Sequence, residues 1–378
     1  MKTENVKGFK DYSGKDALKR AEILRLVAET FERYGFEPAE TPIVEYEEFV
    51  RGENTSDEAV RDTFKLEDRG KRNLALRYEF TFQLKRLAKN KKLPYKRYQI
   101  GPLFRDEPIR EGRARQFIQC DVDVVGSTIK DEAECLATFN EIFEKLGIKV
   151  NIYINNRKLL NEILEKEGIK EKDREGALRE IDKLDKLSEK EVLSNLKKFG
   201  AEKLMKTFKK EEKFFEKYDS YGEIKELKEY CNFFGVNVEF RPFLVRGLSY
   251  YNSSVFEVWS KELKVSICGG GSYMVENNQA TGISLGLEPL MLIEKFKFSD
   301  ERYLVVSLEQ DKKALELVKK LRKGGKKVSV YYGKPSKALE YADSYGFGRV
   351  VFVGEREVES REFKVKDMVS GKEEALKI

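Results

Sequence analysis

The chain has no histidine among its 378 residues, and its four cysteines are widely spaced. Without imidazole there is no Ser-His-Asp triad, no histidine general base and no histidine metal ligand. No Cys-x-x-Cys pair occurs, so the sequence indicates neither a zinc knuckle nor a disulfide framework. Whatever chemistry this protein performs must proceed without imidazole from its own side chains, and we assign no metal-binding residue.

Long apolar runs are also missing, since no stretch approaches the roughly 20 apolar residues of a membrane span. The polar start "MKTENVKGFKDYSG" is not typical of a signal peptide, so we expect a cytoplasmic protein without a membrane partner. Charged residues make up 37% of the chain, with 73 Lys and Arg against 67 Asp and Glu. This slight basic excess permits a nucleic-acid partner, although a solvated Lys/Glu surface gives the same composition.

The length allows two domains with substantial cores. Apolar residues at helical spacing predict a helix over 14–34, followed by an extended segment around Pro38 and Pro42. The stretch 157–235 is rich in Lys and Glu and predicts an inserted helical subdomain. Strands return after it, and "ICGGGSYM" predicts a glycine-rich turn. Beyond 298, strands alternate with helices over 311–323 and 336–346, which is typical of a small α/β domain.

A segment rich in arginine, "FRDEPIREGRARQF" from residue 104, predicts a loop between two strands. Arg105 and Arg113 could clamp a polyphosphate there, because each guanidinium offers a planar fork that meets phosphate oxygens and stays charged. Glu107 could hold these forks in place or accept from an adenine amino group. The alternative is a surface hairpin with ion pairs that are individually worth roughly 0 to 1 kcal/mol.

The strand that follows, "QCDVDVV", places Gln119, Asp121 and Asp123 on one face, because side chains alternate along a strand. Such a face could grip a cationic or amine-bearing substrate. The glycines of "CGGGSY" permit close approach of a ligand, but a tight turn would need them equally. The segment "VRGLSYY" places a lone Arg246 before paired tyrosines, which is most often the edge of a half-buried strand.

Taken in order, several segments resemble the histidyl-tRNA synthetases, a family of class II aminoacyl-tRNA synthetases, in their archaeal and eukaryotic style. The segments are "LRYEFT", "FRDEPIREGRARQFIQCDVDVVGS", "IDKLDKLSEKEV", "LVRGLSYYNSSVFEV", "GGGSY" and "SKALEYADSYGFGRVVFVGEREV". The resemblance covers nearly the whole chain. It implies an α+β fold: a class II core with an antiparallel sheet flanked by helices, a helical insertion, and a C-terminal α/β anticodon-binding domain.

The resemblance also implies domain boundaries, a reaction and partners. We expect the first part of the catalytic core at 1–156, the insertion at 157–235, the second part of the core at 236–298, and the anticodon-binding domain at 299–378. The implied reaction activates L-histidine with ATP and Mg²⁺ to histidyl-adenylate and transfers it to tRNA(His). A homodimer is implied, with the N-terminal helix and the strand around Pro42 at its interface as motif 1.

Individual residues match positions of the family. For ATP, the resemblance assigns Arg105 to the α-phosphate, Glu107 to adenine, and Arg113 to the β- and γ-phosphates. For histidine, it assigns the α-amino group to Glu79, Thr81 and Gln119, the imidazole to Asp123 and Tyr251, and the pocket wall to Tyr273. Arg246 matches the arginine that contacts the α-phosphate and the substrate carboxylate. The substrate carboxylate is ionised at neutral pH, so it can attack without a base.

Three positions depart from the family pattern. Pro289 stands where the family has the motif 3 arginine on the γ-phosphate, Ser249 replaces an acidic residue, and "GGGSYM" places Ser272 and Met274 where the family has Arg and Asp. Three hypotheses therefore stay open: an active synthetase in which another residue, such as Lys295 or a motif 2 arginine, contacts the γ-phosphate; a weakened paralogue that senses histidine or tRNA; and a regulatory subunit like that of ATP phosphoribosyltransferase.

Overall fold

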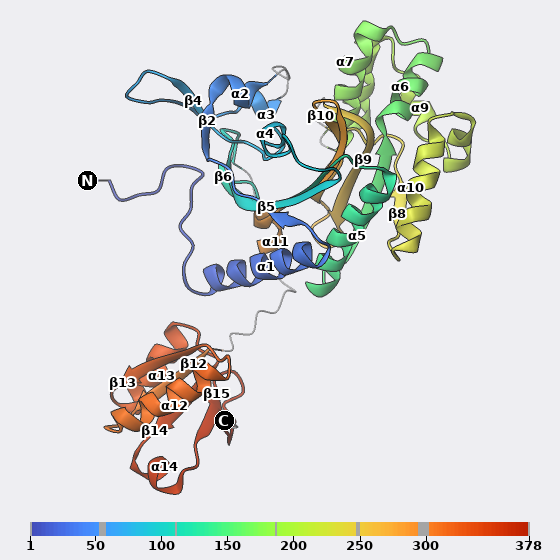
Figure 1. Ribbon diagram of the computed structural model, residues 1–378. Helices are drawn as coiled ribbons and strands as arrows, with labels where there is room; N and C mark the ends of the chain where they lie inside the picture. Colours follow the sequence, from blue (N-terminus) through green and yellow to red (C-terminus); the bar gives the residue numbers. More distant parts are fainter. Residues whose placement is uncertain are drawn as a thin grey trace. The chain divides into compact units, whose positions relative to one another are not determined.

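The computed structural model describes residues 2–52, 58–109, 112–185, 187–246, 250–293 and 302–376 (Figure 1). The chain divides into two compact units. One contains Met1–Asp11 and Glu22–Phe296, and the other contains Tyr12–Ala21 and Lys297–Ile378. Among the described helices, none is both long and apolar enough to cross a membrane.

The first unit is built on an eight-stranded sheet in the order β1-β5-β6-β11-β10-β9-β7-β8. Neighbouring strands are antiparallel except for the pairs β1 with β5 and β7 with β8. The mostly antiparallel sheet expected from the sequence is confirmed. Its strands are β1 (Glu37–Pro38), β5 (Tyr95–Phe104), β6 (Gln116–Val125), β7 (Val150–Asn156), β8 (Val238–Phe240), β9 (Tyr251–Ser260), β10 (Ser266–Val275) and β11 (Asn278–Gly286).

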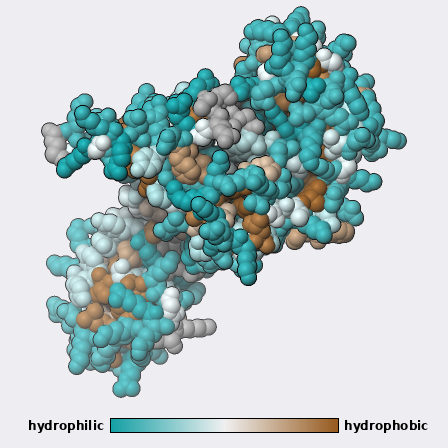
Figure 2. Space-filling model, turned by 45° about the horizontal axis from the view of Figure 1, so that its top comes forward, coloured by the Kyte–Doolittle hydropathy of each residue, from teal (hydrophilic) through white to brown (hydrophobic). Residues whose placement is uncertain are grey.

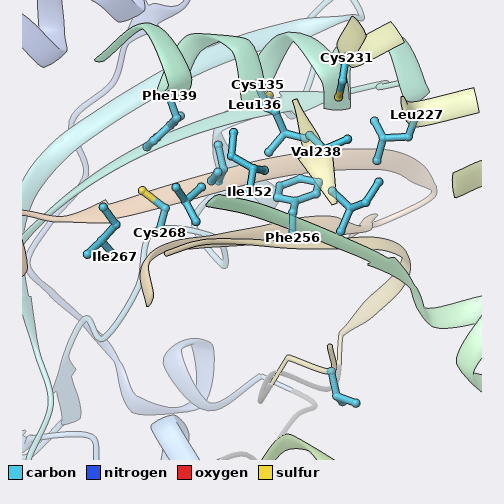
Figure 3. Close-up of a cluster of buried hydrophobic side chains, with 14 of the residues drawn as sticks. Cys135, Leu136, Phe139, Ile152, Leu227, Cys231, Val238, Phe256, Ile267 and Cys268 are labelled. Atoms are coloured by element: carbon cyan, nitrogen blue, oxygen red, sulfur yellow. The ribbon is translucent and has the colours of Figure 1, made fainter. Parts of the chain in front are cut away.

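Helices cover one face of this sheet. α1 (Gly14–Arg33) and α5 (Ile129–Lys145) bury apolar side chains against Cys120, Val122 and Val124 of β6, which alternate with the polar residues of that strand. Figure 3 shows this core, where Phe139 and Leu136 of α5 lie over strands β7, β9 and β10. Side chains alternate along a strand, so the residues between these apolar ones face the opposite side of the sheet.

A three-stranded sheet and short helices complete the core portion of this unit. The small sheet has the order β2-β4-β3, with β2 (Val44–Tyr46), β3 (Lys65–Glu67) and β4 (Asn73–Leu76). The helices beside it in the sequence are α2 (Glu47–Arg51), α3 (Glu58–Arg61) and α4 (Leu84–Leu87), and α11 (Leu287–Met291) follows β11.

The stretch expected to be a helical insertion is helical. It contains α6 (Arg157–Lys166), α7 (Glu171–Ile181), α8 (Glu189–Leu196), α9 (Leu204–Thr207) and α10 (Tyr221–Phe233), with 3-10 turns at Asp182–Asp185, Lys197–Phe199 and Glu212–Lys217. Apolar residues of these helices, such as Leu178, Val192 and Leu227, are buried in the same core as α5. Figure 2 shows that the visible outer face is mostly hydrophilic, as the Lys/Glu content predicts.

The second unit has a five-stranded sheet in the order β13-β12-β14-β15-β16, with the first three strands parallel. Its elements are β12 (Tyr303–Ser307), α12 (Asp311–Lys323), β13 (Val328–Tyr332), α13 (Pro335–Ser344), β14 (Arg349–Val353), α14 (Glu355–Ser360), β15 (Lys364–Asp367) and β16 (Glu373–Ala375). The expected α/β domain is confirmed, and the helix predicted over 336–346 lies at Pro335–Ser344.

One prediction is wrong. The glycines of "ICGGGSYM" do not form a turn, because Cys268 to Val275 pair with β11 and most of the same residues pair with β9 on the other side. These glycines lie in the interior of β10. Glycine lowers the stability of a strand interior, so a local reading favours a turn, and the reason for glycine here is found in the side chains that cross the strand.

Candidate active site

The sheet face opposite the helices carries two rows of cross-strand neighbours. Asp123 of β6 lies beside Arg97 on one side and Gly282 on the other, and Gly282 lies beside Gly271. The second row, two residues along each strand, runs from Gln99 through Asp121, Ser284 and Gly269 to Glu257. Directly opposite residues on neighbouring strands have Cβ atoms about 5 Å apart, so each row is a line of close neighbours.

Asp123 is fixed by two neighbours. Its Oδ2 lies 2.7 Å from Nη2 of Arg97, which is fully buried, and its Oδ1 accepts a hydrogen bond from the Tyr273 hydroxyl. Arg97 Nη2 also donates to the backbone carbonyl of Phe80 at 3.0 Å. Burial raises the pKa of Asp123, while the charge of Arg97 and the hydrogen bond from Tyr273 oppose this shift. The carboxylate is therefore held in one orientation on the sheet face opposite the helices.

The glycines of β10 and β11 make room for these side chains. A Cβ on Gly282 would lie 2.1 Å from Asp123 Oδ1, and one on Gly269 would lie 2.2 Å from Nη2 of Arg246. A Cβ on Gly271 would lie 2.7 Å from Cδ1 of Tyr251. These distances are shorter than real Cβ contacts, so a side chain at any of the three positions would force its neighbour to move.

Arg246 lies above this glycine floor and pairs with Glu257 through its Nη1. Burial lowers the pKa of Arg246, but the charge of Glu257, the neighbouring Tyr251 and the hydrogen bond to Glu257 act together against this effect, and the pKa is raised. The other carboxylate oxygen of Glu257 accepts from Nε1 of Trp259 at 2.9 Å. The arginine is thus charged and held by a partner that also contacts the only tryptophan of the chain.

Three tyrosines form one wall. The ring centroid of Tyr250 lies 4.8 Å from that of Tyr251 and 5.4 Å from that of Tyr273. The Tyr250 hydroxyl donates to Oε2 of buried Glu79 at 3.3 Å. Thr81 is half-buried, and its carbonyl accepts from the first N–H of α4 at 3.0 Å. The structure therefore brings Glu79, Tyr251 and Tyr273 to one side of the site.

The arginine-rich segment is a hairpin, as predicted. Arg105 Nε donates to the carbonyl of Tyr78 at 3.1 Å, and its guanidinium lies 5.1 Å above the Phe117 ring. Arg113 pairs with Glu107 at 3.3 Å between Nη1 and Oε2, and 56% of its side chain is exposed. Of the two roles open to Glu107, the structure contains the first, a carboxylate that holds an arginine fork. Arg110 lies outside the described residues.

Pro289 occupies the first turn of α11, three residues after the N-cap Gly286, where proline is tolerated. Its Cα would lie 3.8 Å from a Cβ placed on Gly112, so this position lies beside the hairpin. The preceding Glu288 accepts the backbone N–H of Ile118 at 3.0 Å. Ser249 and Lys295, which bear on two of the open hypotheses, lie outside the described residues.

Sequence reasoning did not single out Arg97 or Glu257, and it noted Tyr250 only as one of the paired tyrosines of "VRGLSYY". Glu257 had a signal, because a carboxylate interrupts the apolar run "VFEVW". The sequence around Arg97 carries no such signal, since the position of Arg97 beside Asp123 depends on the register of the hairpin. The roles that the resemblance assigns to individual residues stay predictions.

A mostly antiparallel sheet with an arginine-bearing hairpin and a separate C-terminal α/β domain defines a class II aminoacyl-tRNA synthetase. Residues 8–290 match the family model described as histidyl-tRNA synthetase, and residues 302–378 match the anticodon binding domain. The chain belongs to the histidyl-tRNA synthetase family.

Relatives match over the full length. A protein named histidine–tRNA ligase 2 from Shouchella clausii is 32% identical over 98% of this chain and 97% of its own length. Histidine–tRNA ligase 1 from Bacillus cereus strain ATCC 10987 is 34% identical, over 99% and 95%. The crystal structure of histidyl-tRNA synthetase from Nostoc sp. PCC 7120 superimposes with a TM-score of 0.85 at 25% identity, covering 100% of this chain and 97% of that one.

These comparisons bear on the open hypotheses. The chain is an aminoacyl-tRNA ligase by family, with both a catalytic and an anticodon-binding domain. The regulatory alternative is not favoured: the structure titled as an ATP phosphoribosyltransferase regulatory subunit/histidyl-tRNA synthetase, from Bacillus halodurans, is 21% identical and shares the fold, with a TM-score of 0.75. The relatives are bacterial, so the expected archaeal and eukaryotic style finds no support.

Proposed function

We propose that this protein activates L-histidine with ATP to histidyl-adenylate and transfers the histidyl group to tRNA(His). The observation that carries the proposal is the glycine floor, which lies between the fixed carboxylate of Asp123 and the half-buried, charged Arg246. A carboxylate on one side and a guanidinium on the other suit an amino acid that has a polar side chain and a free carboxylate.

In this proposal, Asp123 and Tyr251 contact the imidazole, with Tyr273 holding Asp123 in place. Glu79, Thr81 and Gln119 bind the α-amino group. Tyr250, which donates to Glu79, orients that carboxylate.

For ATP, we assign Arg105 and Arg246 to the α-phosphate, Glu107 to adenine, and Arg113 to the β- and γ-phosphates. The exposure of Arg113 supports its role, because a ligand from solvent can reach the exposed guanidinium. Mg²⁺ is proposed as the ion that accompanies ATP, usually held by phosphates and one or two carboxylates. The described residues contain no group of three or more metal-ligating side chains, so we assign it no protein ligand.

Adenylation then needs no base from the protein. The substrate carboxylate is ionised at neutral pH and attacks the α-phosphorus, which releases pyrophosphate. The work of the enzyme is to hold two anions together and to neutralise the charge that develops, and Arg105 and Arg246 supply positive charge for this. In the transfer step, a phosphate oxygen of the adenylate accepts the proton of the tRNA hydroxyl. Both steps suit a chain without histidine.

We also propose a homodimer in which the N-terminal helix and the segment around Pro42 form part of the interface. The strand expected at Pro42 is not present, because β1 ends at Pro38 and β2 begins at Val44. Ile43, Val44, Tyr46 and Leu66, in or beside the small sheet, expose large apolar side chains, each at least 40% accessible. Several exposed apolar side chains on one small sheet favour an interface there. Light scattering should give twice the chain mass, and Val44→Lys should shift the mass toward that of one chain if this surface is the interface.

The remaining expectations are proposals of the same kind. The domains are placed at 1–156, 157–235, 236–298 and 299–378, and the protein is assigned to the cytoplasm, where ATP and tRNA are found. Binding of tRNA should weaken as salt rises, because phosphate contacts release counterions.

The first test is histidine-dependent exchange between ATP and pyrophosphate with the purified protein. Exchange with histidine, and with no other amino acid, would support the proposal and show that Pro289 is compatible with adenylation. Protein that binds histidine but gives no exchange would instead match a sensor.

A further inference from the structure

Asp121 is a second buried carboxylate on the face of β6 opposite the helices. Its side chain lies between those of Gln119 and Asp123 along the strand, and the residue is 5% exposed. Gln119 Nε2 donates to its Oδ2 at 3.0 Å. Its Oδ1 has no hydrogen-bond partner within the part of the chain that the structure describes. A buried carboxylate with an unpaired oxygen is costly unless a donor pairs with it.

The charges around Asp121 leave it short of positive partners. Arg97, the buried cation nearest in the register, pairs with Asp123 at 2.7 Å. Arg77 also lies in the electrostatic surroundings, but its guanidinium donates to the carbonyls of Thr41 at 2.6 Å and Pro102 at 3.0 Å. Burial, and then the charge of Asp123, raise the pKa of Asp121 well above its usual range. A cation placed beside Oδ1 would relieve both effects.

Asp121 and Arg246 lie on the same face of the sheet, on opposite sides of β11. Asp121 lies beside Ser284, and Ser284 beside Gly269, over which Arg246 lies. The two strands β6 and β10 are thus separated by β11 alone, about 10 Å from backbone to backbone. Ser284 is small and turns its hydroxyl to the Gly269 carbonyl at 3.2 Å, which keeps the floor low. Where the side chains of Asp121 and Arg246 both extend toward β11, they narrow this gap. An amino acid, whose ammonium and carboxylate groups are bonded to one carbon atom, could then contact both side chains.

We propose that Asp121 binds the α-ammonium group of the substrate amino acid through Oδ1, while its Oδ2 holds the Gln119 amide in the orientation that contacts the same group. This inference rests on the proposed function. It places the α-ammonium and carboxylate groups of histidine over the cross-strand row that contains Asp121, and the imidazole over the row that contains Asp123. Each oxygen of Asp123 already has one partner, Arg97 or Tyr273, whereas Oδ1 of Asp121 has none among the described residues.

The test compares histidine with imidazolepropionate, which is histidine without its α-amino group. Both are titrated into the wild-type protein, Asp121→Asn and a control, Glu132→Gln, while Trp259 fluorescence and heat of binding are followed. Glu132 is a suitable control because it is a buried carboxylate on the opposite face of the same sheet. Asp121→Asn should weaken histidine roughly 10- to 100-fold, the range for a lost hydrogen bond to a charged group. Imidazolepropionate should bind this variant as it binds the wild type.

Each other outcome overturns the inference in a recognisable way. Equal losses for both ligands would make Asp121 a structural support of the pocket, and unchanged binding of both would leave it without a role. If the wild type itself does not bind histidine, the proposed function fails, and this inference fails with it. Should Asp121→Asn not fold, as judged by its melting curve, Asp121→Ser gives the same comparison with a smaller side chain. Glu132→Gln should preserve the wild-type ratio of the two affinities.

Discussion

Glu132 should make the stability of the first unit depend on pH. It lies near the start of α5, where the Ser272 hydroxyl donates to its Oε1, and its Oε2 finds no hydrogen-bond partner among the described residues. Burial raises the pKa of Glu132 from 4.5 to about 7, although hydrogen bonds from Ser254 and Ser272 oppose this shift. In the unfolded chain the pKa returns to its usual value, so the folded state binds the proton more tightly.

The sign and size follow from this difference. The stabilisation from the protonated form is fully present below pH 4.5 and is lost as pH rises through about 7. A shift of this size corresponds to about 3 kcal/mol, at roughly 1.4 kcal/mol for each pKa unit. Urea unfolding followed by Trp259 fluorescence, at pH 5 and pH 8, measures it, because Trp259 lies in β9 of the same sheet.

Glu132→Gln isolates this contribution, since glutamine keeps the shape and cannot ionise. Other groups that titrate do so in both proteins, so their effects cancel in the difference. The wild type should lose up to about 3 kcal/mol more than the variant between the two pH values. Parallel pH profiles for the two proteins would refute the reasoning, because they would mean that folding leaves the pKa of Glu132 unchanged.

Three further predictions concern the site. Gly282→Ala should push Asp123 from Arg97 and raise the KM for histidine at least about tenfold with the KM for ATP unchanged; equal changes in both would contradict this. Gly269→Ala should displace the Arg246 guanidinium and lower kcat for pyrophosphate exchange by about 100-fold, as when one charge-stabilising group is removed; near-normal kcat would show that Arg246 is dispensable. Pro289→Arg should lower the KM for ATP, because the new guanidinium lies beside the hairpin, and a higher KM would count against that placement.

Local patterns in the sequence predicted the parts of the site that depend on one strand or one helix. Alternation along β6 placed Gln119, Asp121 and Asp123 on one face, which the burial of Cys120 and Val122 on the other face confirms. Helical periodicity likewise placed α12 at its observed bounds. These features can be predicted from the periodicity of one helix or strand, which is visible in consecutive residues of the sequence.

Features that depend on two or more strands were beyond such patterns. No motif distinguishes Arg97 within the sequence of β5. It becomes the partner of Asp123 only through the pairing of β5 with β6. The glycines of β10 were misread for the same reason: their local signal is a turn, while their cause is the bulk of Arg246 and Tyr251 arriving from elsewhere. Close approach between distant segments leaves no periodic trace in either one.

The same strands divide stability and binding between their two faces. On the site face, Gly269, Gly271 and Gly282 contribute no apolar burial, and each glycine costs roughly 0.5–1 kcal/mol relative to alanine. On the helix face, Ile283 and Leu285 of β11 are buried against the core and offset this cost. A fully buried side chain of this kind contributes about 1.5–3 kcal/mol. The site face can therefore consist of glycines and charged side chains, because the residues that alternate with them along each strand pack against the helices and hold the strands together.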